Sequence, residues 1–206
     1  MVNKPKLKIG KKESNTGLDE LWLEIGIDCD LKCTYCFNSA GGIREEQGTL
    51  NVCEYLDLLK QFKDMGGGTI GIPGAGEPLI QSNLETTLTI LDYCDKNGLH
   101  LVIFTNAQQI NDDLVSRLNQ NHVSLMVKYN SSNPIIQDTL AGIIGYTTRR
   151  EKSIQKLLKN GFNSDSRLGF VSSIMDDNYD EIPEIFRYCR NNGIIPDFDT
   201  ILEQGR

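Results

Sequence analysis

Residues 21–38 of this chain read LWLEIGIDCDLKCTYCFN, an apolar segment followed at once by three closely spaced cysteines. The apolar part is short and rich in Leu and Ile, which predicts a buried β-strand over residues 21–28. Cys29, Cys33 and Cys36 then fall in the loop that leaves this strand. In parallel α/β folds, functional sites gather at the carboxyl ends of the strands. The cysteine loop is therefore the predicted centre of the site.

The rest of the chain alternates between strand-like and helix-like segments. Further strands are predicted at 69–73, 100–106, 123–129, 167–175 and 194–202, and helices at 49–65, 83–97, 112–119, 134–140, 149–160 and 180–192. This alternation predicts a parallel sheet with helices outside it and right-handed crossovers.

The length of the chain separates the possible α/β architectures. A complete eight-stranded barrel needs about 250 residues, whereas this chain has 206. We therefore predict an open partial TIM-type (β/α)6 barrel of parallel strands, with a flat doubly wound sheet as the alternative. Residues 1–20 are predicted to be an N-terminal extension, and residues 21–206 one core domain.

The composition is that of a globular protein with an acidic balance. Apolar residues make up 39% of the chain, charged residues 24%, and the net charge is −7. This balance disfavours nucleic acid as the main partner, because phosphate binding uses a basic surface. No apolar run is long enough to span a membrane, and residues 1–12 lack the apolar core of a signal peptide. The chain is expected in the cytoplasm, with no membrane partner.

A cytoplasmic location makes disulfides unexpected, so the six cysteines are expected to be free thiols or metal ligands. Cys53, Cys94 and Cys189 stand singly in helical patterns and are predicted to be buried free thiols. His100 and His122 fall at strand starts, at the opposite end of the sheet from the cysteine loop, and are predicted to be structural.

The clustered cysteines suit an iron–sulfur cluster. Three thiolates within eight residues can bind three irons of a four-iron cube and leave the fourth iron open to a ligand. Two alternatives are a non-catalytic electron-transfer module and a zinc-stabilised α/β binding protein. Electron carriers usually use four cysteines for each cluster and zinc sites four ligands, yet no fourth cysteine or histidine lies nearby in the sequence.

The run C-x3-C-x-aromatic-C resembles the signature of radical S-adenosylmethionine (SAM) enzymes. The resemblance implies that Cys29, Cys33 and Cys36 hold one [4Fe-4S] cluster, whose open iron is chelated by the amine and carboxylate of SAM. It implies that the backbone of Tyr35 meets the adenine. It also implies the reaction, in which one electron splits SAM into methionine and a 5′-deoxyadenosyl radical that takes hydrogen from a substrate.

A second segment supports this resemblance. Gly74-Ala75-Gly76-Glu77-Pro78 ends the second predicted strand and looks like the family's Gly-Gly-Glu-Pro segment, which binds the SAM amino group. Such a group needs carbonyl or carboxylate acceptors, and glycine lets the backbone come close.

The next three strands end in polar residues that the resemblance brings near SAM. The candidates are Thr105 and Asn106 in a Thr-Asn-Ala sequence that resembles the family's Thr-Asn-Gly, then Asn130, Ser131 or Ser132 for the ribose, and Ser172 and Ser173. For Thr105 and Asn106, an ordinary polar strand exit is the alternative.

Charged residues inside two strands also point to the site. Alternation puts Lys128 on one strand face with Met126. A lysine in an apolar strand is costly unless paired, so Lys128 is predicted to face inward and meet a carboxylate of SAM or substrate; outward snorkelling is the alternative. Asp197 and Asp199 share one face of the last strand, where they either bind substrate or SAM hydroxyls or protect an exposed sheet edge.

The resemblance also suggests partners. An enzyme of oxidoreductase or transferase/maturase type is expected, with a low-potential electron donor such as flavodoxin or ferredoxin. A peptide or protein substrate is favoured over a small metabolite, because an open barrel side admits a large molecule. Many relatives carry a cysteine-rich C-terminal extension with further clusters. Residues 1–206 hold no such extension, so one cluster is expected, and a further domain or a partner could close the barrel.

Overall fold

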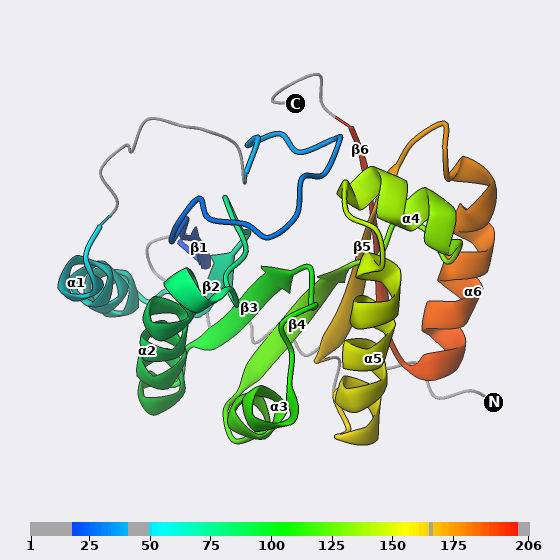
Figure 1. Cartoon of the computed structure of the whole chain (residues 1–206). Helices are drawn as coiled ribbons and strands as arrows, with labels where there is room; N and C mark the ends of the chain where they lie inside the picture. Colours follow the sequence, from blue (N-terminus) through cyan, green and yellow to red (C-terminus); the bar gives the residue numbers. More distant parts are fainter. Residues whose placement is uncertain (1–17, 41–49, 165–166, 202–206) are drawn as a thin grey trace.

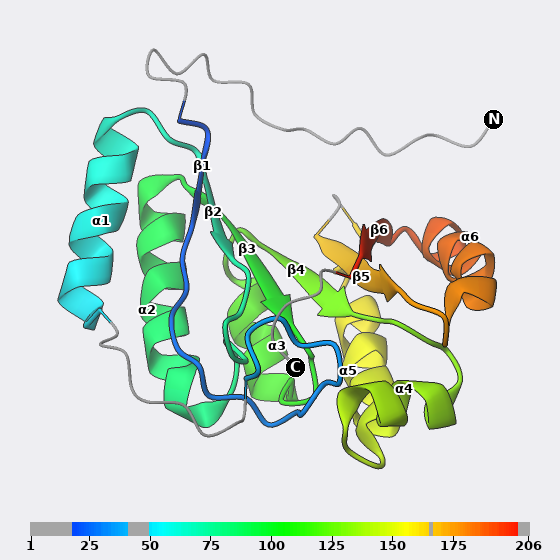
Figure 2. The same ribbon diagram turned by 90° about the horizontal axis from the view of Figure 1, so that it is seen from above.

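The computed structural model describes residues 18–40, 50–164 and 167–201, and these form a single six-stranded parallel sheet. Its strands follow one another in sequence order, each parallel to its neighbour. They are β1 (Glu20–Trp22), β2 (Thr69–Ile72), β3 (His100–Thr105), β4 (Val123–Lys128), β5 (Leu168–Ile174) and β6 (Ile195–Thr200). The sheet curls into an open half-barrel, as Figures 1 and 2 show. A doubly wound sheet would reverse its strand order at a switch point, so the partial barrel is confirmed.

The helices lie outside the half-barrel (Figure 2). They are α1 (Val52–Asp64), α2 (Gln81–Asn97), α3 (Asp112–Asn119), α4 (Pro134–Ala141), α5 (Tyr146–Lys159) and α6 (Ile182–Asn192), with a short 3-10 turn, η1 (Tyr179–Glu181), before α6. No helix among the described residues is both long and apolar enough to cross a lipid bilayer.

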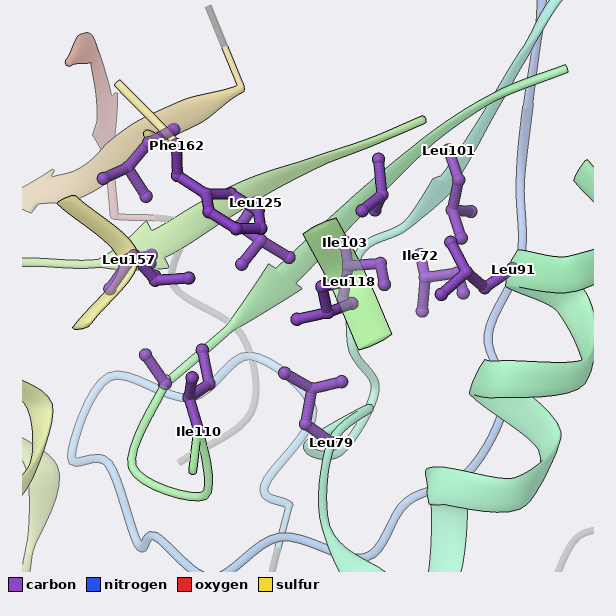
Figure 3. Packing of buried hydrophobic residues seen from close by; sticks show 14 of the residues in the cluster. Ile72, Leu79, Leu91, Leu101, Ile103, Ile110, Leu118, Leu125, Leu157 and Phe162 are labelled. Atoms are coloured by element: carbon purple, nitrogen blue, oxygen red, sulfur yellow. The ribbon is translucent and has the colours of Figure 1, made fainter. Parts of the chain in front are cut away.

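The main hydrophobic core lies between the sheet and these helices. Strand residues of one parity, such as Ile72, Ile103 and Leu125, point outward because successive side chains alternate between faces. They pack against Leu91 of α2 and Leu118 of α3, as Figure 3 shows. The other parity faces the inside of the half-barrel and remains available for a site.

The first strand is shorter than predicted. Pairing with β2 ends at Trp22, and only the Leu23 amide still donates to the Gly71 carbonyl beyond it, at 2.8 Å. Beyond Leu23 the chain leaves the ladder to reach the cysteine loop. A Cβ at Gly26 would lie 2.3 Å from the Asn83 side chain, so the chain here runs against the start of α2.

One cysteine prediction is also wrong. Cys94 and Cys189 are buried free thiols as predicted, but Cys53 is exposed. Helix α1 buries Tyr55 and Leu59, which lie on one face, and Cys53 points away from that face. The predicted extension lies mostly outside the described residues, as do the predicted start of the first helix at residue 49 and the end of the last strand at residue 202.

Candidate functional site

A cavity of about 580 Å³ opens at the carboxyl ends of the strands, between the cysteine loop and the inner face of the half-barrel. Figure 1 shows the cysteine loop, in blue, above this end of the sheet. The cavity is lined by all three clustered cysteines and by Tyr35, Gly74, Gly76, Glu77, Thr105, Asn106, Lys128 and Ser173, together with apolar residues of the inner face. Most of the residues that the sequence singled out therefore meet in one place.

The three thiols of the loop share this cavity, and none of them is in a disulfide. The Cys36 amide donates to the Cys33 carbonyl at 3.2 Å, which folds the loop into a turn. Sγ of Cys29 accepts from the Leu31 amide at 3.5 Å, and Sγ of Cys36 accepts from the Ala40 amide at 3.3 Å. Backbone donors to sulfur of this kind also suit a thiolate that binds iron.

The donor set fits a cluster better than a single ion. No three His, Cys, Asp or Glu side chains within the described ranges converge on one metal-ion position. Thiolates of a four-iron cube need not converge, because each binds a different iron. Burial raises the pKa of Cys29 to about 12 and also raises that of Cys33. Protonated buried thiols give up their protons when a metal binds them.

Helix α4 holds the cysteine loop from outside. The Lys32 amide donates to the Ala141 carbonyl at 3.0 Å, and the Thr34 amide donates to the Leu140 carbonyl at 2.9 Å. Gly142 ends α4 with φ of +70°, and a Cβ there would lie 2.4 Å from the Lys32 oxygen. The end of α4 and the loop are thus in direct backbone contact, which only glycine allows.

Tyr146 joins this loop to two strands, a role that no sequence motif signalled. Its ring is fully buried and packs with Leu31 of the loop. Its hydroxyl donates to the Asn106 carbonyl at 2.9 Å and lies 3.4 Å from the Lys128 carbonyl. The residue therefore fixes the ends of β3 and β4 relative to the cysteines.

The glycine-rich segment after β2 docks on the start of the same loop. The Glu77 amide donates to the Asp28 carbonyl at 2.7 Å, and a Cβ at Gly76 would lie 2.2 Å from that oxygen. Nδ2 of Asn38 donates to the Ala75 carbonyl at 2.7 Å. Ala75 itself is buried and does not line the cavity. The two segments that carry the resemblance are thus in contact.

Glu77 is a buried carboxyl group at the cavity wall, only 2% exposed. It accepts hydrogen bonds from the Thr105 hydroxyl at 2.6 Å, the Asn106 amide at 2.7 Å and the Leu79 amide at 3.0 Å. Burial raises the pKa of Glu77 to about 7, against the opposing effect of these donors. Nδ2 of Asn106 in turn donates to Asp30 of the cysteine loop at 2.8 Å.

Lys128 faces the cavity and does not snorkel outward. Its ammonium group donates to Oγ of Ser173 at 2.7 Å and lies 5.1 Å from the centre of the Tyr35 ring. Burial lowers the pKa of Lys128 to about 8, while the nearby Cys33 and Asp199 oppose that shift. A cation with one neutral partner is available to an anionic ligand.

Asn130 and Ser131 lie behind the cavity and do not line it. Both are fully buried, and both amides donate to Oε1 of Gln137, at 2.9 and 3.0 Å. Oδ1 of Asn130 accepts from the Ser173 amide, and the Ser131 hydroxyl donates to Glu181 at 2.5 Å. These contacts organise the strand ends, and a direct role for either residue toward ribose stays a prediction.

Comparison with known proteins agrees with this geometry. The family model of the radical SAM superfamily matches residues 23–194. The chain belongs to the radical SAM superfamily. Membership of this family implies a [4Fe-4S] cluster and SAM as cofactors.

Two curated relatives show how far the likeness extends. A tungsten-containing aldehyde ferredoxin oxidoreductase cofactor-modifying protein from Pyrococcus furiosus is 26% identical over 84% of this chain and 49% of its own length. A probable GTP 3′,8-cyclase from Methanococcus maripaludis is 30% identical over 84% of this chain and 55% of its own length. The chain thus spans about half the length of the curated relatives it matches.

Solved structures of radical SAM proteins share the fold. Streptococcus suis SuiB bound to SAM superposes with a TM-score of 0.74 at 23% identity, over 91% of this chain and 42% of SuiB. The protein anSMEcpe with bound SAM gives a TM-score of 0.72 at 16% identity, over 90% of this chain and 51% of that one.

Proposed function

We propose that this chain holds one [4Fe-4S] cluster through Cys29, Cys33 and Cys36 and cleaves SAM reductively to act on a substrate. The observation that carries the proposal is that three clustered cysteine thiols and the Gly76–Glu77 segment border one cavity. When bound, the cluster supplies the electron that splits SAM into methionine and a 5′-deoxyadenosyl radical, which abstracts hydrogen from the substrate.

The residues of the chain bind and orient SAM in this proposal. The ammonium group of SAM is held near Glu77. Because the pKa of Glu77 is about 7, a cation that binds beside this carboxyl group favours its ionised form. Lys128 holds a carboxylate of SAM or of the substrate. The backbone of Tyr35 contacts the adenine. The cavity volume of about 580 Å³ lies within the range of pockets that bind small molecules, about 300–1,000 Å³. Thr105 and Asn106 hold the Glu77 carboxyl group in the cavity wall by hydrogen bonds.

The substrate is proposed to be a peptide or protein side chain. Two structural neighbours support this class, because SuiB was solved with the precursor peptide SuiA and anSMEcpe with the Cp18Cys peptide. A small metabolite is the second candidate, supported by the probable GTP 3′,8-cyclases among the relatives. Either reaction needs a low-potential donor such as flavodoxin or ferredoxin, and a further domain or partner is proposed to cover the open side of the barrel.

Anaerobic reconstitution followed by a SAM-cleavage assay tests the proposal. Cys33→Ala is expected to lose both bound iron and 5′-deoxyadenosine release, whereas the matched variant Cys53→Ala keeps both, since Cys53 is exposed on α1 outside the cavity. Unchanged activity in Cys33→Ala would refute the ligand assignment. Iron and sulfide without any deoxyadenosine would favour an electron-transfer module, and zinc alone would favour a zinc-stabilised binding protein.

A further inference from the structure

The inner face of the half-barrel carries an apolar floor that runs from the cavity to the first strand. Phe104 of β3 and Met126 of β4 line the cavity. Trp22 of β1 packs beside Phe104, with ring centres 5.5 Å apart, and stays 52% exposed. An exposed tryptophan on the inside of a fold is a large apolar surface with no cover among the described residues.

Glycines on neighbouring strands let the large side chains of this floor lie close to the sheet. A Cβ at Gly71 of β2 would lie 2.8 Å from the Trp22 ring. A Cβ at Gly169 of β5 would meet the sulfur of Met126, 2.4 Å away. Both large side chains therefore lie against bare backbone.

Carboxylates border the floor at both edges of the sheet. Glu20 of β1 accepts from Nε1 of Trp22 at 3.3 Å, which places it on the same face. Asp197 and Asp199 of β6 pair in register with Val171 and Ser173, so they also face inward. Neither aspartate makes an ion pair within the described part of the chain. The two edge strands do not pair with each other, so the face is open between them.

We propose that this inner face binds a polypeptide substrate whose apolar side chain is flanked by basic residues. The face consists of Trp22, Phe104 and Met126, which lie between Glu20 and the two β6 aspartates. The proposal rests on the function proposed above and names its substrate class. The acidic borders attract cationic residues and the aromatic floor contributes contact area, while Lys128, in register with Asp197 through Val171 of β5, is the cation on the same face. An extended chain that lies across the floor reaches the cavity at Phe104.

The probe is a synthetic peptide with a central leucine and two lysines on either side, titrated against the reconstituted chain without SAM. Binding is followed by the anisotropy of a dye on the peptide and by Trp22 emission, because Trp22 is the only tryptophan of the chain. A peptide with glutamates in place of the lysines is expected to bind roughly tenfold more weakly or not at all.

Matched variants locate the binding site. Asp197→Asn with Asp199→Asn is expected to weaken binding of the lysine peptide roughly fivefold to tenfold and to reduce its salt dependence. Asp57→Asn with Asp64→Asn removes the same charge from the exposed side of α1 and is expected to leave binding unchanged.

Three outcomes would overturn the inference. Equal affinity for the lysine and glutamate peptides is one, and unchanged binding by the β6 double variant is another. The third is tighter peptide binding after replacement of Lys6, Lys8 and Lys11 by glutamine, which would make the chain's own basic N-terminal segment the occupant. Because binding is measured without SAM, its failure is distinguishable from failure of SAM cleavage.

Discussion

Replacement of Gly76 by alanine probes the contact between the glycine-rich segment and the cysteine loop. The new Cβ would lie 2.2 Å from the Asp28 carbonyl oxygen and 2.6 Å from the Ile27 carbonyl carbon. Real Cβ atoms essentially never come this close to backbone, so one of the two segments must move. The Glu77 amide, which donates to the same Asp28 oxygen at 2.7 Å, would then lose its partner.

The size of the effect follows from these two losses. Overpacking of a close contact costs about 1–3 kcal/mol. Loss of a partner for a buried amide costs roughly a further 1–3 kcal/mol. The sum, on the order of 2–6 kcal/mol, acts on the segments that carry the cysteines and Glu77. If only half of it appeared in SAM affinity, binding would weaken by about fivefold at the lower bound and by about 150-fold at the upper bound.

The assay is 5′-deoxyadenosine release by the reconstituted chain as SAM is titrated, combined with thermal unfolding. Gly76→Ala is expected to raise the SAM concentration needed and to lower the melting temperature. Gly68→Ala is the matched control, because no atom lies within 4 Å of the position that its Cβ would take and its φ is not left-handed. A Gly76→Ala variant with the control's melting temperature and SAM dependence would refute the packing argument.

Three other changes test further parts of the site. Burial raises the pKa of Glu77 from 4.5 to about 7, so between these pH values the folded state holds a proton that the unfolded state has lost. The contribution of Glu77 to the free energy of unfolding therefore falls as the pH rises from 4.5 to about 7, and Glu77→Gln should remove this pH dependence in urea unfolding. Gly142→Ala should lower iron incorporation, because its Cβ would meet the Lys32 carbonyl of the cysteine loop. Gly98→Ala should not, because Gly98 also ends a helix with a left-handed φ but its Cβ would meet no described neighbour. Arg150→Leu should cost about 1.5–3 kcal/mol in unfolding free energy, since the buried guanidinium donates to Gln137 and the substitution removes this charge-assisted hydrogen bond; a loss below about 1 kcal/mol would contradict this.

The sequence predicted what depends on local pattern. Alternating periodicity indicated the order of strands and helices, and the length of the chain favoured a half-barrel. Alternation along β4 put Lys128 on one face with Met126, and the cost of an unpaired lysine in an apolar strand predicted that it faces inward. The spacing of Cys29, Cys33 and Cys36 predicted a shared site, since three thiolates within eight residues of one loop can bind three irons of one cluster.

Only the tertiary structure decided what depends on contacts between distant segments. It showed that α4 and Tyr146 hold the cysteine loop, that Asn130 and Ser131 are buried and bonded to Gln137 behind the cavity lining, and that β1 ends early at Trp22. Such contacts arise when surfaces far apart in the chain pack together, and no local period records which surfaces will meet. The chemistry of the site was therefore readable from the chain, while its supports were set by packing.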